Sequence, residues 1–353
     1  SFIASMSGEG NLRVEENLGE GYVRLRVSEA ERRQAKHDIQ HVEDIVIEML
    51  RNARDAGADK VYLATTKEDG VRTLVFLDNG SGVPQDMQER IFDARVTSKL
   101  ESMKMDRWGV HGRGMALFSI KQNTDEARVV ASDVDLGSVF KVSVATDRLG
   151  ERADQSSWPQ AVKDEDGHYV CARGPHNIIR AACEFALEEL RACDVYLGSP
   201  SEIAATLHAQ ASSRLDASRL LFIDDEAELP VVDRLGLASD AEDFIRICSG
   251  LGLEMSERTA HRILAGQIKP VRGVTARLLR ERDSSSHAPA PVDLAKDRRG
   301  LRIAKDDMAQ FSRAVERDFN DLAARYYLNL CGDPKIRVSR DRITVTFDLA
   351  KEE

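Results

Sequence analysis

The sequence predicts an α+β protein: a mixed β-sheet with helices packed on one face, followed by a largely helical α/β C-terminal region. Two observations carry this prediction. A helical pattern over 41–56 precedes two strand patterns that are joined by a turn at 68–70. Alternating segments then follow a glycine-rich stretch at 109–114. This order of helix, paired strands, loop and strands is typical of a two-layer sandwich of one sheet and its helices.

Each expected element rests on a local pattern. Apolar residues recur at helical spacing along 41–56, and Gly57 is a helix stop signal. The segment 95–107 is charged and has no period, which predicts a loop able to move. A further helix is expected at Leu117–Asn123. The expected strands are Tyr22–Val27, Lys60–Thr65, Thr73–Leu77, Val129–Ser132 and Ser138–Ala145.

Composition excludes several classes of protein. With 353 residues, 42% of them hydrophobic and 31% charged, the chain is long enough for two or three globular domains. It has no apolar run long enough to span a membrane and no signal-peptide pattern. Its five cysteines contain no Cys-x-x-Cys pair, which argues against a disulfide framework or a structural zinc site. We therefore expect a cytoplasmic protein.

Charge is divided unevenly along the chain. The net charge of −10 argues against binding of nucleic acid over the whole surface. Residues 256–302, however, contain 11 Lys/Arg and 5 Asp/Glu, a local charge of +6. Within them, 255–266 resembles the second helix of a helix-turn-helix, with Ser256 as its cap and Arg258 and Arg262 on one face. Duplex DNA is thus a candidate partner, and a solvated basic helix is the alternative.

Three short motifs carry the chemistry of a predicted site, and the first lies on the helix at 41–56. Glu48 and Asn52 are four residues apart and project from one face, and Asp55 follows one turn later. An Asn carbonyl oxygen suits Mg²⁺, and a carboxylate one turn away can act as a general base toward water. Alone, this pattern also fits the solvent face of an ordinary amphipathic helix.

The second motif ends a predicted strand. Asp78 follows the apolar run 74–77, and a carboxylate there can accept a hydrogen bond from an exocyclic amine such as that of adenine. Gly80 and Gly82 let the backbone lie against a flat ring, and the motif continues to Val83, which we assign to the same site. Alone, Asp-Asn-Gly is also an ordinary turn.

The third motif consists of Gly109, Val110, His111, Gly112, Arg113 and Gly114, just before an apolar helix start. Backbone N–H groups of a glycine-rich segment that opens a helix can bind phosphate oxygens. No Gly-Lys-Ser/Thr follows, so the segment is not a Walker A loop, and its spacing differs from the Rossmann fingerprint. Lys99 and Arg113 can neutralise phosphate charge, with solvent-facing loop charges as the alternative.

In this order and spacing the three motifs resemble the Bergerat-fold (GHKL) ATPases, the superfamily of DNA gyrase, the ninety-kilodalton heat-shock chaperone, sensor histidine kinases and MutL. The resemblance covers about residues 20–147 and implies a two-layer sandwich that binds ATP and Mg²⁺. It implies Glu48 as the general base, Asn52 as the Mg²⁺ ligand and Asp78 as the adenine-reading carboxylate. It further implies that Gly80 and Gly82 line the base, that Gly109, Gly112 and Gly114 form the hinge of a phosphate lid, and that Ser138 helps hold adenine.

The sequence looks most similar to the MutL, gyrase and topoisomerase VI B branches. The run 52–58 and the segment 97–99 resemble MutL, whereas 109–114 is nearer the gyrase pattern. Glu48 stands where sensor histidine kinases usually carry Asn or His. One departure from MutL is Met115, which follows Arg-Gly where MutL has Glu.

The resemblance and the composition together divide the chain. The polar segment 147–167 is an expected boundary. The expected parts are a flexible arm at 1–20, a GHKL ATP-binding domain at 21–150, a small α/β domain or transducer-like segment at 168–235, and a mostly helical region at 236–353 with a basic helix-turn-helix-like segment at 256–282 and a terminal β-hairpin.

The leading hypothesis is an Mg²⁺-dependent ATPase. ATP would order a lid at 95–114 and drive conformational change or homodimerisation, coupled to duplex DNA through 256–302 or to a protein partner. In relatives a lysine from the following domain reaches the γ-phosphate, and Lys269 is one candidate here. Two alternatives stay open: a protein kinase of the same fold, and a non-hydrolysing, nucleotide-dependent DNA-binding or regulatory module.

Overall fold

The chain divides into two compact units, residues 1–283 and 284–353. The predicted site lies in the first. Within these units the computed structural model describes residues 14–98, 104–106, 109–111, 114–190, 192–215, 223, 225–285, 308, 311–312, 314–316, 319, 328–330, 334–338 and 343–351.

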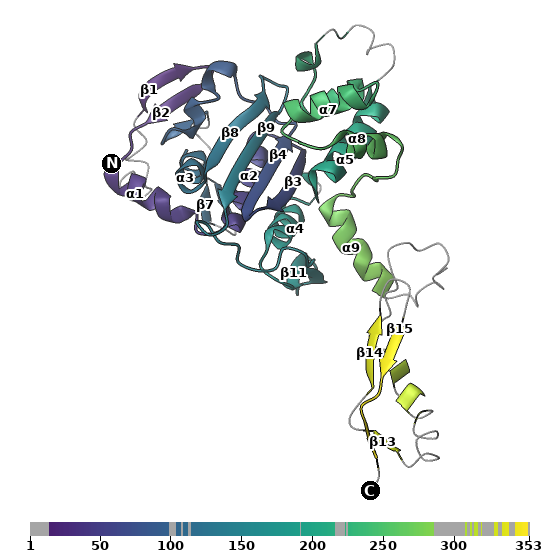
Figure 1. Ribbon diagram of the computed structural model, residues 1–353. Helices are drawn as coiled ribbons and strands as arrows, with labels where there is room; N and C mark the ends of the chain where they lie inside the picture. The colour runs from purple at the N-terminus through teal and green to yellow at the C-terminus, as the bar shows by residue number, and fades with distance from the viewer. Residues whose placement is uncertain are drawn as a thin grey trace. The chain divides into compact units, whose positions relative to one another are not determined.

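A five-stranded mixed sheet forms the centre of the first unit (Figure 1). Its first two strands are parallel, and all other neighbours are antiparallel. The hairpin turn predicted at 68–70 has positive φ at Asp69 and Gly70, as an Asp-Gly turn allows. In sheet order the strands are β12 (Asp194–Gly198), β3 (Lys60–Glu68), β4 (Val71–Asp78), β9 (Ser138–Ala145) and β8 (Glu126–Ser132).

One face of this sheet is covered by α2 and α4, with α2 behind the strands in Figure 1. Leu50 of α2 and Phe185 of α4 share a core with Leu63 and Phe76 of the sheet. The sheet with its helices is the α+β layering that the sequence predicts. The helices on this side are α2 (Val42–Asp55), α3 (Ala116–Asn123) and α4 (Ile178–Glu188).

The opposite face of the sheet is also covered, by helices that come later in the chain. Because successive strand residues point to opposite faces, Tyr62, Val75 and Leu77 enter a second core with these helices. The two predicted layers are thus extended by a third, since the chain after Gly198 folds back onto the sheet. The helices are α5 (Pro200–Arg214), α7 (Ala241–Gly250) and α8 (Glu257–Leu264).

Strand β12 changes the predicted domain boundaries. A division between 21–150 and 168–235 does not match the sheet, because β12 pairs with β3 from Asp194 with Lys60 onward. The segment 147–167 looks like a linker in sequence because it is polar and mostly exposed. It contains instead the first strand of a hairpin within the same unit, in which β10 (Gln160–Lys163) pairs with β11 (Tyr169–Arg173).

A second, small sheet lies at the N-terminal end of the described chain. The prediction of a flexible arm at 1–20 is wrong from Val14 onward, because the backbone there pairs with the next strand around a turn with positive φ at Glu20 and Gly21. Residues 1–13 lie outside the described residues. The elements here are β1 (Val14–Gly19), β2 (Tyr22–Leu25), β5 (Val96–Thr97) and α1 (Glu29–Asp38).

The segment predicted to be a mobile loop is described only in part. Where it is described, it contains the short strand β6 (Lys104–Asp106), which pairs antiparallel with β7 (Gly109–His111) just beyond the predicted loop. The remaining elements of the first unit are the short 3₁₀ helices η2 (Gln85–Met87), η3 (Arg90–Phe92), η4 (Glu226–Glu228) and η5 (Arg234–Leu237). Helix α9 (Val274–Ser285) begins in this unit, which ends at residue 283.

The second unit contains two short antiparallel pairs. The first is β13 (Leu328–Leu330) with β16 (Leu349–Lys351), and the second is β14 (Lys335–Val338) with β15 (Ile343–Thr346). Across the described part of the whole chain, no helix has the length and apolar character needed to span a membrane.

Candidate functional site

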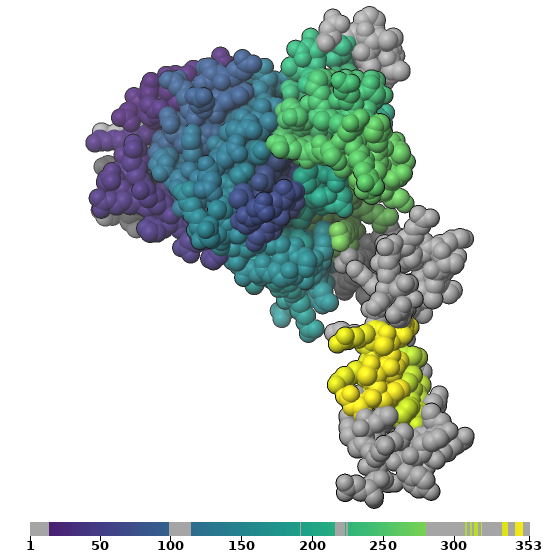
Figure 2. All heavy atoms as spheres, viewed as in Figure 1, coloured from purple at the N-terminus to yellow at the C-terminus, as the bar shows by residue number. Residues whose placement is uncertain are grey.

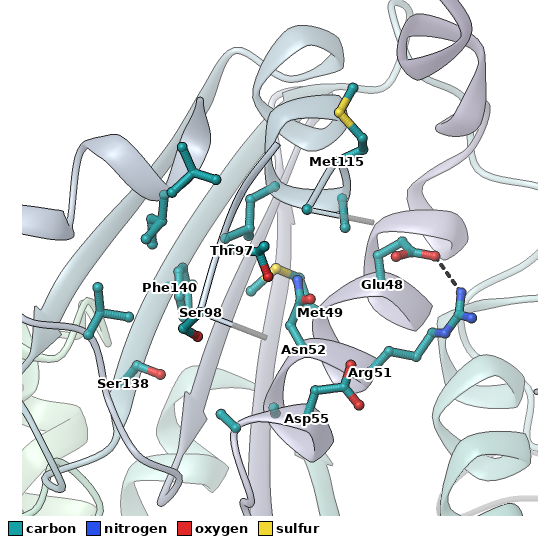
Figure 3. A pocket seen from close by; sticks show the side chains of 18 of the residues that line it. Glu48, Met49, Arg51, Asn52, Asp55, Thr97, Ser98, Met115, Ser138 and Phe140 are labelled. Carbon is teal, nitrogen blue, oxygen red and sulfur yellow. Dashed lines mark hydrogen bonds and ion pairs between the residues drawn. The ribbon is translucent and has the colours of Figure 1, made fainter. Parts of the chain in front are cut away.

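A cavity of about 590 Å³ lies beside α2, at the ends of β4 and β9 and the start of α3 (Figure 3). It brings together residues from all three sequence motifs. Tyr22, Thr97 and Ser98 line it as well. The predicted site residues along its wall are Glu48, Asn52, Asp55, Asp78, Gly82, Val83, Gly114 and Ser138.

Helix α2 presents a carboxylate to the cavity in a fixed position. Figure 3 shows Asn52 and Asp55 leaving α2 on one side, with Glu48 one turn earlier. Arg51 Nη1 donates a 2.7 Å hydrogen bond to Glu48 Oε1. The Arg51 side chain is 3% exposed and that of Glu48 is 22% exposed. A buried cation therefore holds a carboxylate that still reaches the cavity.

The amide of Asn52 fits a metal-binding role. Its Nδ2 is buried and has no hydrogen-bond partner among the residues that the structure describes. A half-turn of the amide exchanges its nitrogen and oxygen, so the oxygen can face a bound cation. No group of three or more His, Cys, Asp or Glu in the described ranges could hold a metal ion. Mg²⁺ at Asn52 would thus depend on phosphate and water oxygens for its other ligands.

Asp55 lies on the same side of α2 but is engaged by a neighbour. Arg54 Nε donates a 3.1 Å hydrogen bond to Asp55 Oδ1, and Arg54 Nη1 donates one of 3.0 Å to Glu189 Oε1. Burial works against the charge of Arg54, but these two carboxylates raise its pKa overall. Asp55 is therefore part of a charged cluster that joins α2 to the end of α4.

A second carboxylate is held at the opposite side of the cavity, where β4 ends. Asp78 is 3% exposed, and its cross-strand neighbour on β9 is Ser138. Ser138 Oγ donates a 2.6 Å hydrogen bond to Oδ2, and the Gly80 N–H donates one of 2.8 Å to Oδ1. Each carboxylate oxygen can accept a second hydrogen bond, so Asp78 can still receive one from a ligand.

The glycines of the second motif are required by the protein's own backbone. A Cβ at Gly82, where φ is +69°, would lie 1.8 Å from the carbonyl oxygen of Asp133. A Cβ at Gly80 would lie 2.8 Å from the carbonyl oxygen of Ala56. From the sequence, these glycines were expected to make room for a flat ring. The structure shows a more direct reason for them, because residues 80–83 pack closely on the end of α2 and on the β8–β9 turn.

The phosphate-binding motif is described only in part. The backbone of Gly109, Val110 and His111 forms β7, so it is a strand and does not open a helix directly. Gly114 lines the cavity, has φ of +67°, and its carbonyl accepts a 2.8 Å hydrogen bond from the Arg95 N–H. The remaining predicted residues, Lys99, Gly112 and Arg113, lie outside the described residues.

Two polar side chains of the cavity were not predicted from the sequence. Ser119 is 1% exposed, and its Oγ has no hydrogen-bond partner among the described residues. Burial raises the pKa of Tyr22, although a hydrogen bond with Ser98 acts in the opposite direction. The available signal for Ser119 was its position one turn into the helix that follows the glycine-rich motif.

The comparison with known families agrees with this geometry. Residues 39–132 match the sequence profile of the family described as "Histidine kinase-, DNA gyrase B-, and HSP90-like ATPase". That range contains Glu48, Asn52, Asp78 and the strands β3 and β4. Over these residues the chain is similar to the ATP-binding domain of the GHKL ATPase superfamily.

Within that superfamily the chain is similar to MutL. Over 136 residues it is 28% identical to "DNA mismatch repair protein MutL" of Staphylococcus aureus, in strains Newman and JH1. The match covers 36% of this chain and 20% of MutL, so the shared part spans about a fifth of that relative's length.

Proposed function

We propose that this chain binds ATP with Mg²⁺ in the cavity beside α2 and hydrolyses it. One observation carries the proposal: α2 presents the carboxylate of Glu48 and the amide of Asn52 one turn apart, facing the same cavity as Asp78. The Asn52 Nδ2 has no partner within the described residues. The family of the domain supports the nucleotide, and the donor set supports a hard cation among phosphates.

Each residue has a defined part in this proposal. Asp78, oriented by Ser138 and Gly80, accepts a hydrogen bond from the exocyclic amine of adenine. Asn52 would hold Mg²⁺, which would supply positive charge to neutralise the phosphates. Glu48 accepts the proton of the water that attacks the terminal phosphorus, and Arg51 keeps its carboxylate in place.

The proposal extends to a conformational change. Thr97, Ser98 and Gly114 line the same cavity as Asn52 of α2, so a nucleotide that fills it contacts both segments. A ligand that bridges two segments stabilises the arrangement in which both contact it. We therefore propose that ATP orders the segment 95–114 as a lid and drives homodimerisation, coupled to duplex DNA or to a protein partner.

Removal of the general base tests the proposal. Glu48→Ala should lower ATP turnover at least about 100-fold while a non-hydrolysable analogue still binds, because general-base catalysis contributes roughly 10²- to 10⁴-fold. Glu29→Ala, which removes an exposed carboxylate on α1, is the matched control and should leave turnover unchanged. Equal hydrolysis by wild-type protein and Glu48→Ala would overturn the assignment. Labelled γ-phosphate on protein instead of in solution would favour a kinase.

The metal assignment has its own test. Asn52→Ala should bind ATP in Mg²⁺ no better than wild-type protein binds it in EDTA, because the protein oxygen for the cation is gone. Calorimetric titrations with and without Mg²⁺ measure this difference. A strong Mg²⁺ effect that persists in Asn52→Ala would place the cation elsewhere.

A further inference from the structure

Helices α7 and α8 form a helix-turn-helix. Ile247 and Cys248 of α7 share a core with Ala260 and Ile263 of α8, so the two helices pack against each other. Between them the chain reverses at Gly252, which has φ of +69°. Ser256 Oγ then caps α8 by accepting a hydrogen bond from the Thr259 N–H. Two packed helices joined by a glycine-containing turn are the arrangement that many proteins use to place the second helix in the DNA major groove.

The outer face of α8 carries side chains suited to base edges. Ala260 and Ile263 are buried, whereas the residues between them on the helix surface are exposed. Arginine pairs with guanine and glutamine with adenine in the major groove. In Figure 2 the segment that contains α7 and α8 is green and lies on the visible surface. A shallow hollow on this face is lined by Glu257, Arg258, His261, Arg262, Ala265 and Gln267.

The charges on this face are available to a partner. Arg258 and Arg262 are exposed, and so are Lys269 and Arg272 just after the helix. None of these four forms an ion pair with a residue in the described part of the chain, in contrast to the buried Arg51. Glu257, the acidic residue of this helix, has its Oε1 atom 3.7 Å from Nε2 of His261. Clustered, exposed cations on an otherwise acidic protein complement a phosphate backbone.

The helix-turn-helix packs directly on the sheet whose strand β4 ends at the proposed nucleotide site. Val75 and Leu77 of β4 enter the same core as Ala260 and Ile263. A Cβ at Gly252 would lie 3.8 Å from Val75 Cγ1, so the turn itself contacts this strand. The next residue of β4 after Leu77 is Asp78, and the orientation of α8 is thus set by the strand that ends in the nucleotide site.

We infer that α8 binds in the major groove of duplex DNA. Arg258, Arg262 and Gln267 contact base edges, and Lys269 and Arg272 contact phosphates. This inference rests on the DNA-coupling part of the proposed function, but it requires no ATP hydrolysis.

Fluorescence anisotropy of a labelled 30-base-pair duplex of random sequence, with the full chain and without nucleotide, tests the inference. We expect the logarithm of the binding constant to fall linearly with the logarithm of the salt concentration. The double variant Arg258→Ala/Arg262→Ala should bind at least about tenfold more weakly, and Lys269→Ala/Arg272→Ala, which removes the two phosphate contacts, should reduce the salt slope by about 2. The control Arg128→Ala/Arg148→Ala removes two exposed arginines from the β8–β9 region and should bind like wild-type protein.

The outcomes separate this inference from the proposed ATPase. Equal DNA binding by wild-type protein and the α8 double variant, or no binding by either, would overturn the inference. So would binding to an acidic peptide with no preference for duplex DNA. ATP turnover of the same proteins without DNA is measured in parallel. ATP turnover without DNA binding would support the ATPase and overturn the DNA-binding inference. DNA binding without turnover would support the DNA-binding inference and overturn the ATPase. Unchanged thermal unfolding of the double variant excludes misfolding.

Discussion

Arg51 donates a 2.7 Å hydrogen bond to Glu48 within one turn of α2, and the two side chains form an ion pair. The pair is asymmetric, because Arg51 is 3% exposed and Glu48 is 22% exposed. Because the Arg51 guanidinium is buried among surrounding atoms, it determines the position of the more exposed Glu48 carboxylate. A carboxylate that must receive a proton from water gains from being held in one position.

Replacement of Arg51 should therefore affect catalysis more than binding. We expect Arg51→Met to lower kcat for ATP about tenfold with KM changed less than twofold, because the carboxylate stays present but loses its support. Arg51→Lys should recover part of the rate, since an ammonium still donates to Glu48. Steady-state ATPase assays measure both constants. A raised KM with an unchanged kcat would show that Arg51 acts on binding instead.

The pair Asp78 and Ser138 predicts a graded effect on affinity. Ser138→Ala removes the 2.6 Å hydrogen bond to Asp78 and should weaken binding of a non-hydrolysable ATP analogue about fivefold, or roughly 1 kcal/mol. Asp78→Asn should weaken it more, because the amide presents a donor where the adenine amine needs an acceptor.

Calorimetry checks both variants against a control on the same strand. Ser143 contacts Thr73 at 3.2 Å, and Ser143 does not line the cavity. Ser143→Ala should therefore bind like wild-type protein. Equal losses of affinity in Ser138→Ala and Ser143→Ala would mean that the effect is on the sheet and not on the site.

Gly82 predicts a stability effect that does not depend on nucleotide. An alanine there meets the carbonyl oxygen of Asp133 at 1.8 Å and is held at φ of +69°, so Gly82→Ala should lower the free energy of unfolding by more than about 2 kcal/mol. Gly57 has φ of +76° and no atom within 4 Å of the position that a Cβ would take, so Gly57→Ala isolates the backbone cost of about 1 kcal/mol. Urea unfolding compares the two. Similar losses would show that the turn relaxes around the new methyl group.

The site was accessible from sequence because its residues sit in short local patterns. Helical spacing alone places Glu48 and Asn52 on one face of α2, and a strand end followed by Asn-Gly places Asp78 at an edge. The contact between Asp78 and Ser138 spans 60 positions, and it followed from the family pattern, not from any local period. Arg51 was missed because a charged residue within an amphipathic helix usually faces solvent.

The tertiary arrangement was less accessible. Strand β12 carries the same short apolar pattern as any edge strand, and nothing local specifies that it pairs in parallel with β3. The third layer has a similar cause: Tyr62 and Leu77 lie in runs that are buried on both faces, which sequence periodicity alone does not distinguish from a one-sided strand. Both features depend on contacts between residues far apart in the chain.

The buried thiol of Cys248 predicts how stability changes with pH. It is 0% exposed in the core of α7 and the sheet, and burial raises its pKa from 9.0 to about 12. Below pH 9 the thiol is protonated in the folded and unfolded states, so it adds no pH dependence. Above pH 9 the unfolded chain loses the proton first, and stability falls by about 1.4 kcal/mol per pH unit until the folded thiol ionises near pH 12.

Urea unfolding of wild-type protein and Cys248→Ala between pH 8 and about pH 10.5 measures this contribution. The variant loses some stability at every pH through the small cavity it creates, so the slope against pH is the quantity to compare. We expect its slope above pH 9 to be shallower by about 1.4 kcal/mol per pH unit. Equal slopes, or rapid alkylation of the native thiol at pH 8, would contradict the burial of Cys248, since only the thiolate reacts and burial keeps it scarce.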